Sequence, residues 1–204
     1  MISKIRFRYS QLYDNNYRGS NLIQESLKKK GLEYPTHEKI RDFIKEVEPK
    51  WNKIEEKVLS SISKISGLKW KEKQVWCYAI GCGRSFSDPL TVKVHETKED
   101  FIDTLVHEMI HQIQIQNEDI VNKNWGDYLY KNYPKETRVT RNHIIVHAIH
   151  KEIYLKIFGK KRLIKDIKES QASIDYKKSW GIVEKNRHKN IIKQFRKAIK
   201  NKSQ

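Results

Sequence analysis

The spacing of apolar residues predicts a long amphipathic helix near the middle of the chain. Thr97 and Asp100 form a capping-box pattern, in which the threonine hydroxyl accepts a backbone N–H and an acid lies near the positive end of the helix dipole. We therefore expect a helix that begins just after Thr97. Apolar side chains then recur every three or four residues, as on a helix with one buried face, at Ile102, Leu105, Val106, Met109, Ile110 and Ile113.

Two strands are expected before this helix. Residues 74–80 are rich in strand-forming types and stop at a turn with two glycines, Gly81 and Gly83. Residues 90–95 alternate between apolar and polar types after the turn signal of residues 87–89. The order strand, turn, strand, helix indicates a small sheet packed against a helix.

Further helices are expected on both sides of this core. A short one covers residues 22–30, and a longer one covers residues 37–65, with a break or kink near Val47–Glu48 because Pro49 cannot donate a backbone hydrogen bond. Near the end of the chain, residues 182–204 predict a helix with one apolar side. The expected fold class is α+β, mostly helical, with a small antiparallel or mixed sheet and helical extensions at both ends. We expect an N-terminal scaffold over residues 1–68, a core over 69–159 and a basic extension over 160–204, packed as one unit.

Residues 107–111 read HEMIH, an HExxH motif inside the expected central helix. Side chains four residues apart lie on the same face of a helix, so the imidazoles of His107 and His111 point toward the same place. Two neutral imidazole nitrogens at that separation suit Zn²⁺, and Glu108 beside them suits the role of general base. The sequence therefore predicts a zinc site in which His107 and His111 are ligands and Glu108 is catalytic.

A third ligand is expected on the histidine-rich helix that begins near Thr140. Three histidines and a tyrosine fall within about 60° of one another around that helix, whereas Glu152 falls about 180° away, which favours histidine over Glu152. His147 is central in the cluster and is the first choice, with His143 as the alternative. The remaining members, His150 and Tyr154, are expected to support the ligands or the substrate.

The composition and net charge of the chain bear on its binding partners and its cellular location. The net charge is +17, and residues 151–204 hold 17 Lys and Arg against 5 Asp and Glu. Such a segment either contacts nucleic acid through phosphates or is a solvated helix docked by its apolar side.

No apolar run approaches the roughly 18 residues that span a bilayer, and the first residues lack the apolar stretch of a secretory signal. We expect no membrane partner. Cys77 and Cys82 are expected to be free thiols in a reducing compartment, so the predicted location is the cytoplasm, or a virion if a phage encodes the chain.

The HEMIH motif, with a histidine-bearing helix after it, resembles the SprT-like zinc metallopeptidases. The two expected strands are similar to those of the minimal zincin core, and the resemblance covers about residues 70–158. It implies a zincin-like core and hydrolysis of peptide bonds. SprT-like proteases include enzymes that clear proteins crosslinked to DNA, which implies substrates associated with nucleic acid. In that family the third histidine lies between glycines, which are missing around His143 and His147, so the choice between these two stays open.

The sequence thus predicts a zinc metallopeptidase of the HExxH type that acts on proteins or peptides. Residues 90–95 are expected to present an exposed strand edge along which an extended substrate pairs. The alternative is a basic protein, nucleic-acid-binding or a phage structural component, on a zincin core that does not cleave. An intact Glu108 between two intact ligands favours the enzyme.

Overall fold

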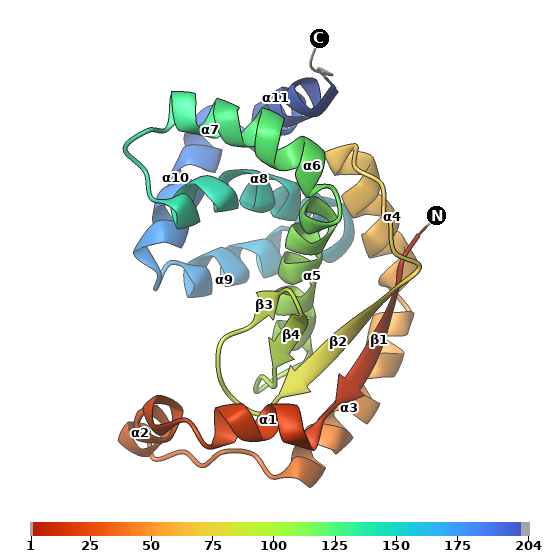
Figure 1. Cartoon of the computed structure of the whole chain (residues 1–204), viewed down its shortest axis with the longest axis vertical. Helices are drawn as coiled ribbons and strands as arrows, with labels where there is room; N and C mark the ends of the chain where they lie inside the picture. The colour runs from red at the N-terminus through yellow and green to blue at the C-terminus, as the bar shows by residue number, and fades with distance from the viewer. Residues whose placement is uncertain (1, 201–204) are drawn as a thin grey trace. The chain divides into compact units, whose positions relative to one another are not determined.

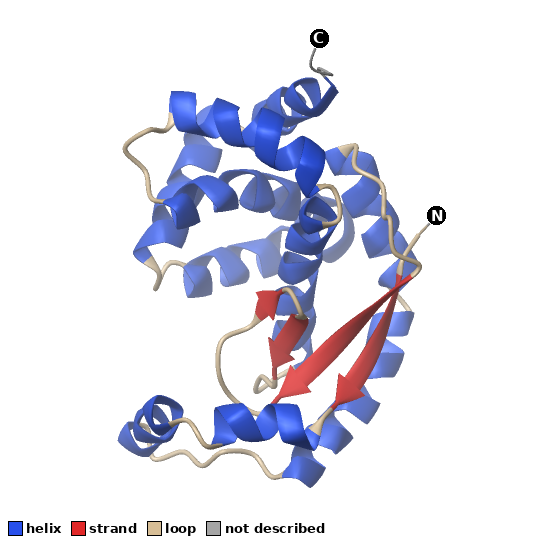
Figure 2. Cartoon of the chain, viewed as in Figure 1, coloured by secondary structure: helices blue, strands red, loops and turns tan. Residues whose placement is uncertain are grey.

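The computed structural model describes residues 2–200 and is α+β, with helices predominating over one small sheet (Figures 1 and 2). The chain divides into two compact units: unit 1 comprises residues 1–57 and 72–112, and unit 2 comprises residues 58–71 and 113–204. These bounds differ from the three expected segments, 1–68, 69–159 and 160–204. One reason is that the first strand pairs with residues 74–79, far along the chain. Residues 201–204, where the expected helix 182–204 ends, lie outside the described part.

The sheet of unit 1 has four strands in the order β1-β2-β4-β3: β1 Lys4–Tyr9, β2 Gln74–Ile80, β3 Phe86–Ser87 and β4 Leu90–Lys93. The strands β1, β2 and β4 run parallel, and β3 is antiparallel to β4. The predicted strand 74–80 is confirmed, and the predicted strand 90–95 ends two residues early. The expectation that residues 90–95 form an exposed edge is wrong, because β3 pairs with β4 there and itself becomes the edge.

Two helices cover one face of this sheet. They are α3, His37–Asn52, and α5, Lys98–Ile115. Phe101 of α5 lies between Phe7 and Phe43, with ring centroids 6.0 Å and 5.4 Å away, so strand, α3 and α5 share one apolar core. Burial of such aromatic rings is the largest single source of core stability in a small unit.

The helix does not break at Val47–Glu48, because α3 continues through Pro49 to Asn52 and a new helix, α4 Glu55–Ser66, follows. Proline removes its own N–H from the helix and crowds the carbonyl one turn earlier, whereas burial of Trp51, two residues later, favours the folded helix. The Trp51 indole also donates to Glu55 at 3.2 Å, across the real break between the two helices.

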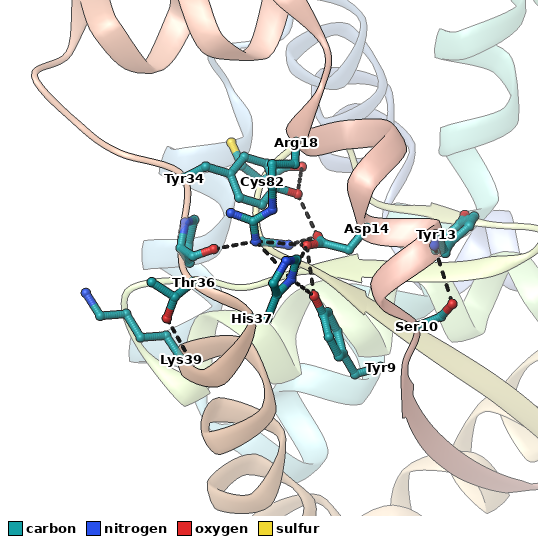
Figure 3. A network of polar contacts seen from close by, with 12 residues as sticks. Tyr9, Ser10, Tyr13, Asp14, Arg18, Tyr34, Thr36, His37, Lys39 and Cys82 are labelled. Atoms are coloured by element: carbon teal, nitrogen blue, oxygen red, sulfur yellow. Dashed lines mark hydrogen bonds and ion pairs between the residues drawn. The ribbon is translucent and has the colours of Figure 1, made fainter.

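The helices α1, Gln11–Arg18, and α2, Asn21–Lys29, follow β1, and α1 lies across the ends of β1 and β2 (Figure 1). Asp14 of α1 is fully buried and joins several segments of unit 1 (Figure 3). Its carboxylate accepts from the Tyr34 hydroxyl at 2.7 Å, the Gly81 backbone N–H at 2.8 Å and the Arg18 guanidinium at 3.1 Å. The Tyr34 ring approaches Gly81 so closely that a Cβ there would lie 2.3 Å from it, and the turn after β2 therefore needs a glycine.

Unit 2 is helical, and α8, Arg138–Ile153, runs through its middle, with apolar residues buried around most of its circumference. Two further helices pack against α8: α10, Ile174–Asn186, and α11, His188–Lys200. The expected single helix over 182–204 is therefore wrong. Arg187 has a positive φ of 63°, a left-handed conformation that ends α10 before α11 begins.

The remaining elements of unit 2 are α6 Glu118–Ile120, the π-helix η1 Val121–Gly126, α7 Asp127–Asn132, the π-helix η2 Tyr154–Phe158 and α9 Lys160–Ser170. The guanidinium of Arg196 on α11 donates to the Lys64 carbonyl at 2.7 Å, which ties α4 into unit 2. Within residues 2–200, no helix combines the length and apolar character that crossing a bilayer requires. Cys77 and Cys82 are free thiols, the first buried and the second half-buried.

Candidate metal centre

The HExxH motif lies in the third and fourth turns of α5, and the local sequence explains why this helix forms. The Thr97 hydroxyl accepts from the Asp100 backbone N–H at 3.1 Å, so the predicted cap is confirmed. The rings of His107 and His111 lie on one face of α5 with centroids 5.0 Å apart. Both side chains are half-buried, which leaves the helix face that they share partly open.

Glu108 lies on the same helix in a nearly dry environment, with 7% of its surface exposed. Burial disfavours the charged carboxylate and raises the pKa of Glu108 to about 7, an effect that Arg84 partly opposes. The negative charge of Glu108 also contributes, after burial, to the raised pKa of the Cys77 thiol on β2. A carboxyl group with a pKa near neutrality is suited to accept and release a proton at physiological pH.

His143, near the start of α8, is held in one orientation by its own helix. Its Nδ1 lies 2.8 Å from the Val139 carbonyl oxygen, which can only accept, so Nδ1 must carry the hydrogen. In the neutral ring the lone pair is then on Nε2, which is the tautomer required of an Nε2 metal ligand. A backbone carbonyl on the other ring nitrogen is a common way to orient such a ligand.

The third member of the candidate metal group is His143. One ligand atom each from His107, His111 and His143 lies within 4.8 Å of the other two, which is close enough for all three to hold one metal ion. His147, the first choice from the sequence, is not in this group, whereas the alternative His143 is. We therefore take His143, one helical turn before His147, as the candidate third ligand.

His147 and the other candidates on this face are engaged within unit 2. His147 Nδ1 lies 2.8 Å from the Ser179 hydroxyl, and its ring stacks on Trp180. His150 Nε2 lies 3.0 Å from a carboxylate oxygen of Asp166. The Tyr154 ring stacks on the His150 ring at 4.2 Å, with 13° between their planes. These contacts are those of a packed helical core.

Glu152 pairs with Lys156 at 2.8 Å and with His188 at 2.9 Å. A further histidine of unit 1, His95, follows β4 along the chain. It is half-buried, and its Nε2 lies 3.0 Å from the Thr104 hydroxyl on α5. Burial, with a smaller contribution from Lys93, lowers the pKa of His95 to about 4.

Sequence reasoning missed Arg84, an exposed residue in the turn between β2 and β3. Its positive charge acts on Glu108, and the turn that carries it is anchored on both sides. The Gly81 N–H donates to Asp14 at 2.8 Å, and the Lys93 N–H donates to the Ser85 hydroxyl at 3.1 Å. The only signal in the sequence was one basic residue directly after a double-glycine turn.

Comparison of the chain with protein-family models, curated proteins and solved structures finds no match. The chemistry of the candidate centre therefore has to be argued from its own residues.

Proposed function

We propose that this chain is a zinc-dependent peptidase in which His107, His111 and His143 bind the metal and Glu108 is the general base. The observation that carries the proposal is the grouping of three imidazole nitrogens within 4.8 Å of one another, with the buried Glu108 on the same helix as two of them. Structural zinc sites usually use four protein ligands, whereas three protein ligands leave a coordination position open for catalysis.

The donor set fits zinc better than it fits Ca²⁺ or Mg²⁺. Ca²⁺ and Mg²⁺ prefer oxygen ligands, and three imidazoles provide none. Imidazole nitrogen is a ligand that Zn²⁺ favours, and His143 has the tautomer that such binding needs. When bound, zinc would supply Lewis acidity toward a carbonyl oxygen and toward a water molecule.

Glu108 would move the proton. Its carboxylate oxygen takes a proton from the attacking water, and the resulting carboxylic acid then donates that proton to the leaving amine. Because the pKa of Glu108 without metal is already about 7, both protonation states are accessible near neutral pH. The positive charge of Arg84 favours the ionised, proton-accepting form.

An extended peptide would be aligned by the edge of the sheet. In the described part of the chain β3 pairs only with β4, so the outer side of β3 offers backbone groups to a further strand. Adding a peptide strand to an open sheet edge is a recurrent mode of peptide recognition. The proposed substrate is therefore a protein segment that can become extended, and proteins associated with nucleic acid remain the candidate class.

The test compares three zinc-loaded proteins on an unfolded substrate such as casein. The wild type should cleave it, and Glu108→Gln should bind the same amount of zinc but cleave on the order of 100-fold more slowly or less. Glu99→Gln is the matched control, because Glu99 is an exposed acid in the first turn of the same helix. Cleavage by Glu108→Gln at the wild-type rate, or no cleavage by the zinc-loaded wild type, would contradict the proposal.

A further inference from the structure

The outward face of the first two strands carries a set of basic and aromatic side chains that the candidate metal centre does not use. Side chains alternate between the two faces of a strand, and the inward set, including Ile5 and Val75, is buried. The outward set on β1 is Lys4, Arg6 and Arg8, all of them exposed. The parallel register places Arg6 beside Trp76 and Arg8 beside Tyr78 on β2.

Trp76 distinguishes this face from an ordinary basic surface. It is 44% exposed, whereas the other four tryptophans are 0–3% exposed. A large aromatic ring in the middle of a strand normally contributes to a core, and here it faces solvent between cations. The Arg8 guanidinium lies 5.4 Å from the ring centroid, so the ring already contacts one cation.

The face has a fixed aromatic border on one side. The Tyr78 ring lies 5.3 Å from the Tyr13 ring of α1, and Tyr13 in turn lies 5.5 Å from Tyr17. The Tyr13 hydroxyl is 2.9 Å from the Thr91 hydroxyl on β4, which holds α1 against the sheet. The open part of the face is thus a strip beside Trp76, and it is formed by paired strands.

The charges along this strip have one sign. The six outward positions of the paired segment are Lys4, Arg6, Arg8, Gln74, Trp76 and Tyr78, and none of them is acidic. Alternate side chains on a strand are about 7 Å apart, so the three cations form a row suited to a linear polyanion. A polyanion that also offers flat rings would satisfy both the row of cations and the exposed indole.

We propose that this strip, consisting of Lys4, Arg6, Arg8, Trp76 and Tyr78, binds single-stranded nucleic acid. The three cations contact successive phosphates, and a base stacks on the Trp76 indole. Proteins that bind single strands without sequence preference combine these two features, because every base has a flat face and every nucleotide has a phosphate. Duplex bases are already stacked on one another, so a duplex could use only the cations.

The binding test uses a fluorescently labelled oligothymidylate of about 15 nucleotides and measures anisotropy at low and moderate salt. Trp76→Ala should weaken binding about 5- to 150-fold, the range that corresponds to the loss of one stacked base. Trp76→Phe keeps an aromatic ring and should stay within a few-fold of the wild type. Arg8→Ala should weaken binding and make it less sensitive to salt, since each phosphate contact contributes to that sensitivity. Lys29→Ala, which removes an exposed cation on α2, is the matched control and should bind like the wild type.

Intrinsic fluorescence provides a second readout that does not depend on affinity. Unlabelled oligonucleotide should quench the tryptophan emission of the wild type, because Trp76 is the exposed indole. In Trp76→Phe this quenching should disappear while the anisotropy change persists. A melting curve for each variant checks that the protein remains folded.

Several results would overturn the inference. One is absence of binding by the wild type, and another is equal binding by Trp76→Ala and the wild type. Heparin and vesicles rich in anionic lipid carry negative charge without bases. If either displaces the labelled oligonucleotide as well as unlabelled oligonucleotide does, the strip binds negative charge without recognising bases, and the inference is overturned. If Lys193→Ala and Lys197→Ala on α11 abolish binding while Trp76→Ala does not, the basic C-terminal segment is the binding surface instead.

Discussion

The ring of His147 lies flat on the indole of Trp180, with centroids 4.3 Å apart and only 8° between the planes. The Ser179 hydroxyl lies 2.8 Å from Nδ1 of the same ring. Both contacts come from α10, so His147 helps to hold α10 against α8. A histidine bound in this way contributes to packing, even though it lies on the same helix face as His143.

We predict that His143→Ala lowers the affinity for zinc, whereas His147→Ala lowers the stability of the fold. The His143 variant should fold but lose zinc affinity by more than about 100-fold, because it lacks a ligand. The His147 variant should keep its zinc but lose about 2 kcal/mol of stability, the sum of one aromatic contact and one hydrogen bond. Elemental analysis of the dialysed proteins and urea denaturation measure the two effects. A zinc-free His147 variant that is fully folded would restore His147 as the ligand.

Glu108 should make the metal-free protein less stable as the pH rises. Burial raises its pKa from an ordinary value of 4.5 to about 7, so the folded state holds the proton up to a higher pH than the unfolded chain does. Stability should therefore decline between about pH 4.5 and pH 7, with a total loss of about 3 kcal/mol. In a chelator, Glu108→Gln should show no such decline relative to the wild type, as followed by urea denaturation at pH 5 and pH 8. Parallel pH profiles for the two proteins would show that the carboxyl is better solvated than its burial indicates.

His95 should have the opposite effect. Burial lowers its pKa from 6.5 to about 4, so the folded state releases the proton while the unfolded chain still binds it. Stability should fall as the pH decreases from 6.5 to 4, again by about 3 kcal/mol. His95→Gln removes this contribution, and its thermal melting temperature at pH 4.5 should approach its value at pH 7 more closely than the wild type does. The prediction fails if the melting temperatures of both proteins fall equally on acidification.

Asp14 should be among the least replaceable side chains of unit 1. Asp14→Asn replaces one oxygen by a donor that faces the Arg18 guanidinium and the Tyr9 hydroxyl, both of which also donate. We expect a loss of about 3 kcal/mol, as for a broken buried ion pair. Asp42→Asn is the control, because Asp42 forms an exposed pair with Lys45, and it should cost less than about 1 kcal/mol. Equal losses in urea denaturation would mean that the buried network does not stabilise unit 1.

The elements that could be predicted from sequence were those with a local signal. The strand at 74–80 and the cap at Thr97 depend on neighbouring residues, and both are found as expected. The strand β1 could not be predicted in this way. Its outward positions are Lys and Arg, and its pairing partner lies about 70 residues further along the chain, so no short-range pattern marks it.

In the candidate metal centre, too, one part could be predicted from local sequence and another part could not. The pairing of His107 with His111 follows from helical spacing alone, and the structure places their rings as expected. Helical spacing could not choose between His143 and His147, because both fall on one face of α8. The choice depends on Val139, Ser179 and Trp180, which fix how each ring is held.

The order in which the two units use the chain has a consequence for how the protein folds and how it can be divided. Unit 2 begins at residue 58, before unit 1 ends at residue 112, so the two are interleaved. No single cut releases either unit as one continuous fragment. During synthesis β1 emerges before β2 and stays unpaired until β2 follows, and contacts of such long sequence separation form slowly. Until then Ile5 and Phe7 are without their core, which makes β1 a segment to which a chaperone would be expected to bind.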